Sequence, residues 1–190
     1  MEIFIETSRL LLRRFTEDDV DNLVELDSDP AVMRFINDGR PTPRQEIEDE
    51  ILPAFLDYYE QFDGYGFWAA EETSTGQFLG WFHFRPEKDA PPGEVELGYR
   101  LRQTAWGKGY ATEGSRALIE KGFTDLGVKR VVASTMVVNG ASRRVMEKAG
   151  LKFVRIFHQE WPDKIEGDEE GDVEYALLRS DWERDAESTT

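Results

Sequence analysis

A glycine-rich turn at residues 106–114 constrains the fold of this chain more than any other segment. It reads Trp-Gly-Lys-Gly-Tyr-Ala-Thr-Glu-Gly, so Gly107 and Gly109 form a Gly-x-Gly. Apolar residues alternate with period two over 94–101, as in a strand, and good helix formers follow the turn as far as Gly127. A strand, a glycine turn and a helix in this order predict a phosphate site, because backbone N–H groups and the helix N-terminus both face the anion.

Two other interpretations of the turn compete with this one. A Gly-x-Gly also makes a simple tight turn that binds nothing, so the motif by itself is weak evidence. A dinucleotide-binding turn needs a third glycine three residues after the second and an acidic residue about 20 residues later. Position 112 is Thr, which counts against the dinucleotide interpretation.

A second motif follows the glycine turn. The β-rich run 131–138 ends at Asn139, and residues 139–151 read as a short helix closed by Gly150. Together with the turn, these segments resemble the GCN5-related N-acetyltransferase (GNAT) superfamily, and within it the branch of ribosomal-protein alanine N-acetyltransferases of the RimJ/RimL type. The resemblance covers nearly the whole chain through four segments in order: a strand at 6–13, the turn at 106–113, the segment 139–151 and a late strand ending near Trp182.

The order of segments predicts an α+β fold, an α/β/α sandwich with a central, mixed, mostly antiparallel sheet of seven strands. The strands are expected at 10–15, 65–71, 78–85, 94–101, 131–138, 152–161 and 173–178, and the helices at 16–26, 30–35, 42–62, from 111 to before Gly127, and within 139–151. Thr42 should cap the long helix, and Pro53 should kink or split it. The resemblance implies that the sheet splays between the strands 94–101 and 131–138. We expect one GNAT domain over 1–184 and a flexible C-terminal tail at 185–190.

The 190-residue chain has no cysteine and two histidines, His83 and His158. It lacks both an apolar run of the roughly 18 residues that span a bilayer and an N-terminal signal, so we expect a cytoplasmic protein without membrane contact. The absence of cysteine excludes disulfides and a cysteine acyl-enzyme. Two histidines cannot define a metal site by themselves, so we expect no metal and predict that each is a strand residue with a hydrogen-bond partner.

The distribution of charge is more informative than the net charge of -16. Residues 100–152 contain eleven Lys/Arg and four Asp/Glu, a local charge of +7, which leaves -23 on the rest of the chain. The basic segment suits a phosphate-rich ligand, whereas an acidic surface repels nucleic acid and attracts a cationic amine. Alternatively, the acidic residues only keep the protein soluble or reflect a salt-adapted source.

The resemblance implies transfer of the acetyl group of acetyl-CoA, a co-substrate, to a primary amine. A lysine-like amine has a pKa near 10.4, so it arrives protonated and must lose a proton before it attacks the thioester. Glu96 is the candidate base because it points away from Leu97 on the strand 94–101, and Glu94, on the same face, is the reserve. Alternatively, both carboxylates lie on a solvated face and take no part in the reaction.

The family pattern also implies a set of cofactor contacts. The pantetheine arm would pair with the backbone of Leu97, Tyr99 and Leu101. The pyrophosphate would meet the turn, whose residues and neighbours are Arg102, Trp106, Gly107, Lys108, Gly109, Tyr110, Ala111 and Thr112. Asn139 would bind the pantetheine amide, Ser142 would reach the cofactor or its sulfur, and Arg143 would approach the adenosine phosphates. Alternatively, Asn139 and Ser142 only cap their helix.

Two positions depart from the family pattern. Thr104 stands where members usually have Gln or Arg, and Arg102 supplies the charge but need not reach the same oxygen. Met146 stands where many members have the tyrosine that protonates the leaving thiolate. Methionine has no proton to donate, so the donor is Ser142 or a water, or the thiolate leaves without one.

The acceptor is left open between a protein N-terminus, a polyamine, an aminoglycoside and an amino acid. Trp68, Trp81 and Phe84 line the acceptor side or belong to the core. The prediction is a monomeric or homodimeric N-acetyltransferase that works by direct attack in a ternary complex. The alternative is a non-catalytic module of the same fold that binds and senses acyl-CoA.

Overall fold

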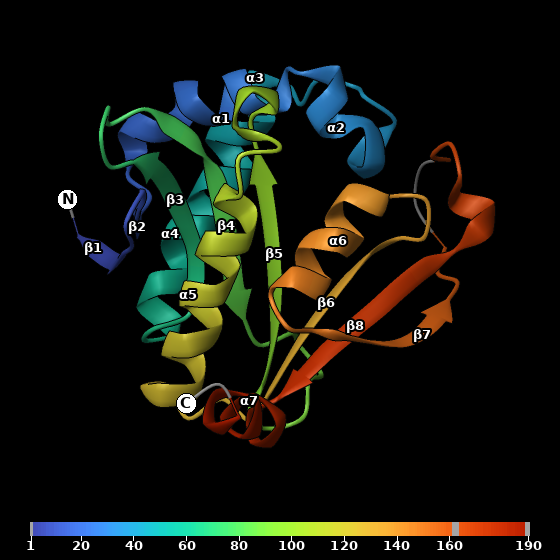
Figure 1. Ribbon diagram of the computed structural model, residues 1–190. Coiled ribbons are helices and arrows are strands. Elements are labelled where there is room, and N and C mark those ends of the chain that lie inside the picture. Colours follow the sequence, from blue (N-terminus) through green and yellow to red (C-terminus); the bar gives the residue numbers. More distant parts are fainter. Residues whose placement is uncertain (1, 161–163, 189–190) are drawn as a thin grey trace.

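The computed structural model describes residues 2–160 and 164–188. Over these residues the chain forms one eight-stranded sheet in the order β1-β2-β3-β4-β5-β6-β8-β7 (Figure 1). Neighbouring strands are antiparallel except β5 and β6, which are parallel. The strands are β1 (Ile3–Glu6), β2 (Leu10–Arg14), β3 (Gly66–Glu72), β4 (Phe78–Arg85), β5 (Glu94–Leu101), β6 (Arg130–Met136), β7 (Lys152–Phe157) and β8 (Asp172–Leu178).

Helices cover both faces of the sheet, with α5 and α6 in front of it and α4 behind it in Figure 1. The helices are α1 (Val20–Asp27), α2 (Pro30–Asn37), α3 (Arg44–Glu46), α4 (Leu52–Gln61), α5 (Tyr110–Thr124), α6 (Gly140–Lys148) and α7 (Arg179–Glu187), with 3-10 turns at Glu17–Asp19, Gln103–Ala105 and Asp168–Glu170. No helix in the part of the chain that the structure describes is long and apolar enough to cross a lipid bilayer.

Alternating side chains of the central strands fill two separate cores. Phe82 and Phe84 of β4 pack under α5, where Gly114 and Gly122 give the rings room: a Cβ at either glycine would lie 2.3 and 2.6 Å from the nearest ring carbon. Trp81 points to the opposite face and belongs to the core beneath α1 and α4. The expected sandwich of helices around a mixed, mostly antiparallel sheet is therefore confirmed.

The sheet opens between β5 and β6. These two strands pair over three residues only, from Glu94 with Arg130 to Glu96 with Val132, and β6 then runs diagonally away from β5 (Figure 1). The predicted splay is confirmed. Glu96 is the last residue of β5 that pairs with β6, so it marks the apex of the opening.

Two predictions about the ends of the chain were wrong. The sheet has an additional strand, β1, which pairs with β2 from Ile3 with Arg13 to Glu6 with Leu11. Only Thr7, Ser8 and Arg9 separate β1 from β2, so the sequence pattern indicated a single strand that begins at Glu6. The late strand ends at Leu178 rather than near Trp182, which lies in α7 and packs its ring against Phe123 with the centroids 5.5 Å apart.

Other element boundaries also differ from the predictions. The long helix divides into α3, a π-helical turn at Ile47–Ile51 and α4, with Pro53 in the first turn of α4. The wide π-turn accommodates a proline that an uninterrupted α-helix would exclude. Pro43, not Thr42, precedes α3 as the cap residue. The expected strand 152–161 ends at Phe157, and Trp161 lies outside the described residues. The predicted tail begins inside α7, and residues 189–190 lie outside the described residues.

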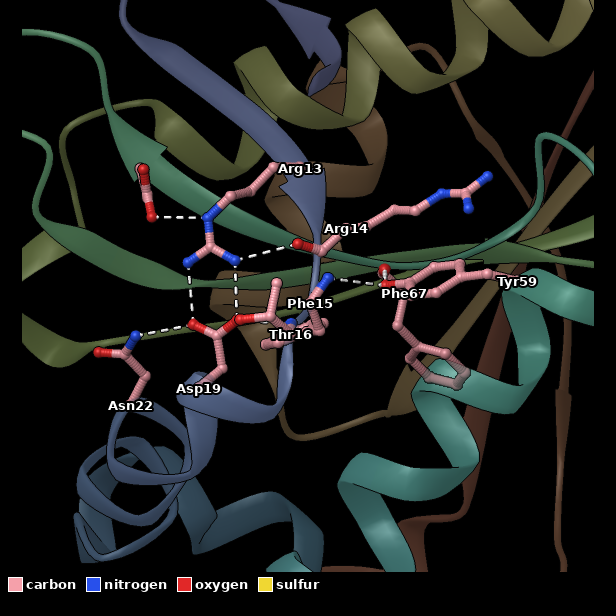
Figure 2. A network of polar contacts seen from close by, with 9 residues as sticks. Arg13, Arg14, Phe15, Thr16, Asp19, Asn22, Tyr59 and Phe67 are labelled. Carbon is pink, nitrogen blue, oxygen red and sulfur yellow. Dashed lines mark hydrogen bonds and ion pairs between the residues drawn. The ribbon is translucent and has the colours of Figure 1, made fainter. Parts of the chain in front are cut away.

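A buried ion pair fixes α1 and its preceding turn to the sheet (Figure 2). The guanidinium of Arg13 donates to both carboxylate oxygens of Asp19 at 2.8 Å and to Glu71 at 2.7 Å. Asp19 also accepts from the Thr16 backbone N–H and the Asn22 amide, each at 2.9 Å. Burial opposes ionisation of Asp19, but these hydrogen bonds outweigh it and lower its pKa.

Candidate active site

The glycine turn presents backbone donors at the N-terminus of α5. Gly107 and Gly109 have φ of 70° and 85°, in the left-handed region that favours glycine, and Gly109 directly precedes the first residue of α5. Among the described residues, no acceptor takes the N–H groups of Gly107, Lys108 or Gly109. The first N–H groups of α5 likewise have no partner inside the helix. The turn therefore has the donors and the dipole that bind a phosphate.

The loop between β1 and β2 holds this turn in place. Glu113, in the first turn of α5, accepts hydrogen bonds from Thr7 Oγ1 at 2.7 Å, the Arg9 N–H at 3.0 Å and Arg9 Nε at 2.7 Å. Arg9 Nη1 also donates to the carbonyl of Lys108 at 2.8 Å, and its guanidinium stacks over the ring of Tyr110. The carbonyl of Lys108 thereby points to Arg9, and the N–H groups of the turn remain available.

The face of β5 that points toward α6 carries Leu97, Tyr99 and Leu101. Both leucines are buried. The hydroxyl of Tyr99 donates to the carbonyl of Ser142 at 3.0 Å and lies 2.9 Å from Ser142 Oγ. Burial raises the pKa of Tyr99 to about 12, against the effect of the Ser142 hydrogen bond, so the phenol stays protonated at neutral pH. Met146 is buried in the adjacent core.

Several residues predicted to contact a cofactor have other partners in the structure. Asn139 caps α6: its Oδ1 accepts from the Ser142 N–H at 3.2 Å, and its Nδ2 donates to Thr135. Arg102 forms a bidentate pair with Glu25 on α1, both distances being 3.0 Å, so its guanidinium is not directed at the turn.

The remaining predicted positions lie at the turn or beside α6. Arg143 donates to the Val137 carbonyl and to the Tyr175 hydroxyl. Trp106 donates from Nε1 to the Leu101 carbonyl at 2.8 Å and keeps its ring half exposed beside Gly107. Lys108 is exposed, Ala111 and Thr112 are partly buried in the first turn of α5, and the hydroxyl of Tyr110 bonds Glu72.

Glu96 lies on the opposite face of β5, at the apex of the splay. Its Oε2 is 3.2 Å from Nε2 of His83 and 3.5 Å from Nη2 of Arg85, the residue that faces it on β4. Burial by itself would raise the pKa of Glu96, but the facing His83, Glu87 and Arg85 outweigh it, and the pKa lies below its ordinary value of 4.5. Glu96 is therefore an ionised carboxylate at neutral pH.

Glu94 lies on the same face but has a strong partner. Its Oε2 accepts from Nη1 of Arg130, the residue paired with it across the parallel ladder. Nη2 of Arg130 also contacts Glu174 at 3.3 Å. Neither carboxylate of β5 is a freely solvated group, so the interpretation as a solvated face does not describe them.

A cavity of about 700 Å3 opens on this same face of the sheet. Its lining mixes charges of both signs with acids in excess, and it extends across β5, β6, β7, β8 and the β4–β5 loop. The lining residues are Arg85, Glu87, Lys88, Asp89, Ala90, Pro91, Glu94, Val95, Glu96, Val132, Ala133, Ser134, Arg155, Phe157, Gln159 and Glu174. Glu96 thus lines this cavity at the point where β5 and β6 separate.

Three residues of this region were missed by sequence reasoning as site residues: Arg9, Glu113 and His83. Glu113 lies in the first turn of α5, and acids at this position of a helix are common for dipole reasons alone. His83 was expected to be a strand residue with a partner, which is how it lies. Its position near Glu96 follows from the register of the antiparallel strands 78–85 and 94–101, which pairs His83 with Gly98 and Arg85 with Glu96.

The aromatic residues assigned either to the acceptor side or to the core are core residues. Trp68, Trp81 and Phe84 are all buried within the two hydrophobic clusters. In residues 2–160 and 164–188, no three His, Asp or Glu side chains gather in a way that could hold a metal ion.

Comparison with known proteins places this arrangement in context. The family model described as an acetyltransferase (GNAT) domain matches residues 9–152. The FsC-acetyl coenzyme A-N(2)-transacetylase of Aspergillus fumigatus is 32% identical over 189 residues, which cover 95% of this chain and 78% of that protein.

Solved structures share the fold. RimL, a ribosomal alpha-N-protein acetyltransferase in complex with coenzyme A, superposes with a TM-score of 0.76 at 21% identity, over 93% of this chain and 98% of that one. Spermidine N-acetyltransferase from Vibrio cholerae, in complex with CoA and spermine, gives a TM-score of 0.73 at 15% identity, over 93% of this chain and 99% of that one.

Proposed function

The chain belongs to the GNAT acetyltransferase family, and on that premise we propose that it transfers the acetyl group of acetyl-CoA to a primary amine by direct attack in a ternary complex. One observation carries the proposal. The glycine turn and the splay open toward one face of β5, the 700 Å3 cavity opens toward the other, and Glu96 stands between them. Two substrates can therefore reach the same point from opposite sides.

The residues present fit acetyl-CoA. The pyrophosphate would take the free N–H groups from Gly107 to Ala111, next to the exposed Lys108. The pantetheine arm would follow the backbone of Leu97, Tyr99 and Leu101, which loses its β6 partner beyond Glu96. Asn139, Arg102 and Arg143 have partners within the protein, so their proposed contacts with the cofactor would require that they also reach it or exchange partners. When bound, acetyl-CoA supplies an acyl group activated as a thioester.

Glu96 is the proposed proton acceptor, and Glu94 remains the reserve. Glu96 is ionised, lines the cavity and stands at the apex of the splay, so an ammonium in the cavity can give it a proton directly or through one water. The ion pair with Arg130 occupies Glu94 more tightly. Its role as base would first require that this pair opens.

A proton must also reach the leaving sulfur. Tyr99 and Ser142 form a hydroxyl pair on the cofactor face of β5, and Met146 has no proton to offer. We propose that a water in the splay supplies this proton, directly or through the Ser142 hydroxyl that Tyr99 holds in place, with Ser142 regaining its proton from that water; alternatively, the sulfur leaves as the thiolate.

The acceptor is proposed to be a cationic amine. The cavity lining has five carboxylates and three cationic side chains, so an ammonium gains attraction there and a second polar group of the acceptor finds Arg85, Lys88 or Arg155. The relatives are named for acting on a protein α-amine, on a polyamine and on an N(2) amine. All three acceptor classes belong in the test.

The test is release of free thiol from acetyl-CoA in the presence of an amine panel. The panel should contain peptides beginning with Ala or Ser, polyamines, an aminoglycoside and free diamino acids, with the acetylated product verified by mass spectrometry. Glu96→Gln keeps the shape of the side chain and removes the proton acceptor, so the rate should fall about 100-fold or more while acetyl-CoA affinity is retained. Loss of rate in Glu94→Gln alone would transfer the role to Glu94. Tight acetyl-CoA binding without turnover of any amine would instead favour an acyl-CoA sensor.

A further inference from the structure

The imidazole of His83 packs against the backbone of β5 in a space that exists because the facing residue is a glycine; we call this space the slot. Gly98 faces His83 across β4 and β5, and a Cβ at Gly98 would lie 2.4 Å from Cε1 of the imidazole. Phe67 contacts the ring edge-on at 5.8 Å between centroids, and Trp81 lies at 6.0 Å. The ring is therefore held between two aromatic side chains and the backbone of β5.

Nε2 of this imidazole is buried and faces one polar atom. It has no hydrogen bond of good geometry within the described residues, and Oε2 of Glu96 lies 3.2 Å away. A buried N–H without an acceptor costs free energy, whereas an N–H donated to a carboxylate is among the stronger hydrogen bonds in proteins. The separation of 3.2 Å is within hydrogen-bonding range, and such contacts commonly tighten when substrates bind.

We propose that His83 is a positioning residue for acetyl transfer, whose Nε2–H donates to Oε2 of Glu96 and holds this carboxylate at the edge of the cavity where β5 and β6 separate. The inference rests on the proposed function of Glu96 as the proton acceptor. It explains why Gly98 lies beside an imidazole on the face that carries Glu96. The proton of the ammonium goes to the Glu96 carboxylate, and the imidazole keeps its own proton throughout.

The contact has a consequence for the pH dependence of the rate. The His83 contact lowers the pKa of Glu96, against the effect of burial. The wild-type rate falls as the pH drops through the pKa of Glu96, so removing the donor should move this acid limb to higher pH. Other ionisable groups face Glu96 and stay in place in the test: Arg85 on β4, Glu87, Lys88 and Asp89 in the β4–β5 loop, Glu94 on β5, Arg130 on β6, Arg155 on β7 and Glu174 on β8.

The experiment compares His83→Phe with His83→Gln and His158→Gln. His83→Phe keeps an aromatic ring in the slot and removes the donor, so kcat should fall about tenfold and the acid limb should move to higher pH, with acetyl-CoA affinity unchanged. His83→Gln places an amide N–H near the position of Nε2. Its kcat should fall less than that of His83→Phe, and its acid limb should lie closer to the wild-type pH. His158→Gln is the matched control, because His158 contacts the Glu169 carbonyl on the surface and does not line the cavity.

A second variant and a spectroscopic measurement keep the proposal testable if His83→Phe fails to fold. Gly98→Ala removes no ionisable group but must displace the imidazole, so it should reproduce the kinetics of His83→Phe. The chain has only two histidines, so nitrogen-15 NMR of the ligand-free protein resolves two imidazoles, and the His158→Gln spectrum assigns them. His83 should carry a proton on Nε2.

The results separate the two levels of the proposal. Unchanged kcat and acid limb in His83→Phe, together with a slow Glu96→Gln, would overturn the role of His83 and leave the proposed function intact. A bare Nε2 in the NMR spectrum would overturn it as well, because two acceptors would then face each other. If wild-type protein acetylates no amine, or if Glu96→Gln retains full activity, the proposed function of Glu96 fails, and the role of His83 fails with it.

Discussion

Arg9 and Glu113 stand 104 positions apart in the chain and form a close ion pair, with Nη2 of Arg9 2.6 Å from Oε2 of Glu113. Because Arg9 also donates to the Lys108 carbonyl, the pair connects the β1–β2 loop to the glycine turn and to the first turn of α5. A phosphate-binding turn works only if its N–H groups stay directed at the ligand.

We therefore expect Arg9→Met to weaken acetyl-CoA binding about tenfold, equivalent to about 1.4 kcal/mol, with little effect on kcat at saturating acetyl-CoA. Isothermal titration calorimetry checks this. Glu183→Gln, which breaks an exposed pair with Arg179 at the far end of the chain, is the control and should bind normally. Equal affinities of Arg9→Met and wild type would show that the turn keeps its shape without the pair.

The glycine turn itself can be tested with a glycine elsewhere as reference. Nothing lies within 4 Å of a Cβ built on Gly107, which has φ of 70°, and the same holds for Gly76 in the β3–β4 turn. Gly107→Glu and Gly76→Glu thus carry similar backbone strain, but only the former places a negative charge at the proposed phosphate site. Acetyl-CoA binding should disappear in Gly107→Glu and persist in Gly76→Glu, as measured by calorimetry; normal binding by a folded Gly107→Glu would disprove the site.

The kinetic mechanism should be sequential. The chain contains no cysteine for an acyl-enzyme, and the proposed cofactor and acceptor sites lie on opposite faces of β5, so both substrates can be bound together. Initial rates measured at several fixed amine concentrations should give intersecting double-reciprocal lines. Parallel lines, or an acetylated protein trapped by mass spectrometry without acceptor, would contradict direct attack.

The buried pair of Arg13 and Asp19 should contribute to stability rather than to catalysis. Asp19→Asn removes one of the two carboxylates that the buried Arg13 guanidinium contacts and leaves it with Glu71, so the free energy of unfolding should fall by about 3 kcal/mol, the lower end of the range for a broken buried pair. The pKa of Asp19 in the folded protein is lowered from its ordinary value of 3.8. Its stabilisation is therefore complete above that value and is lost as the pH falls through the folded pKa.

Urea titrations at several pH values check this prediction. Wild type should lose stability on acidification below about pH 4, where Asp19 of the unfolded chain takes up a proton before Asp19 of the folded protein does, and Asp19→Asn should lose less over the same range. Asp125→Asn, which removes an exposed carboxylate paired with Lys121, is the control and should change stability little. A similar acid dependence in Asp19→Asn and wild type would show that other carboxylates control the acid limb.

Some features of this protein were predictable because they depend on neighbours in sequence. A turn at Gly107 and Gly109 was predicted from the Gly-x-Gly spacing, because glycine adopts the left-handed backbone found there without the steric cost that other residues pay. The opposite directions of Glu96 and Leu97 follow from the two-residue period of a strand. Asn139 caps α6, which was the local alternative to its predicted cofactor contact.

Only the tertiary structure decided which residues that are far apart in the sequence contact one another. Arg102 was predicted to serve the phosphates, but α1 brings Glu25 within 3.0 Å of it. Arg9 reaches Glu113 because β1 and β2 turn back over the start of α5, and a turn of three polar residues gave no sign of the additional strand. His83 meets Glu96 only through the register of β4 with β5. A side chain's intrinsic chemistry is local, but its partner depends on how strands pair and helices pack, which sequence-local patterns do not specify.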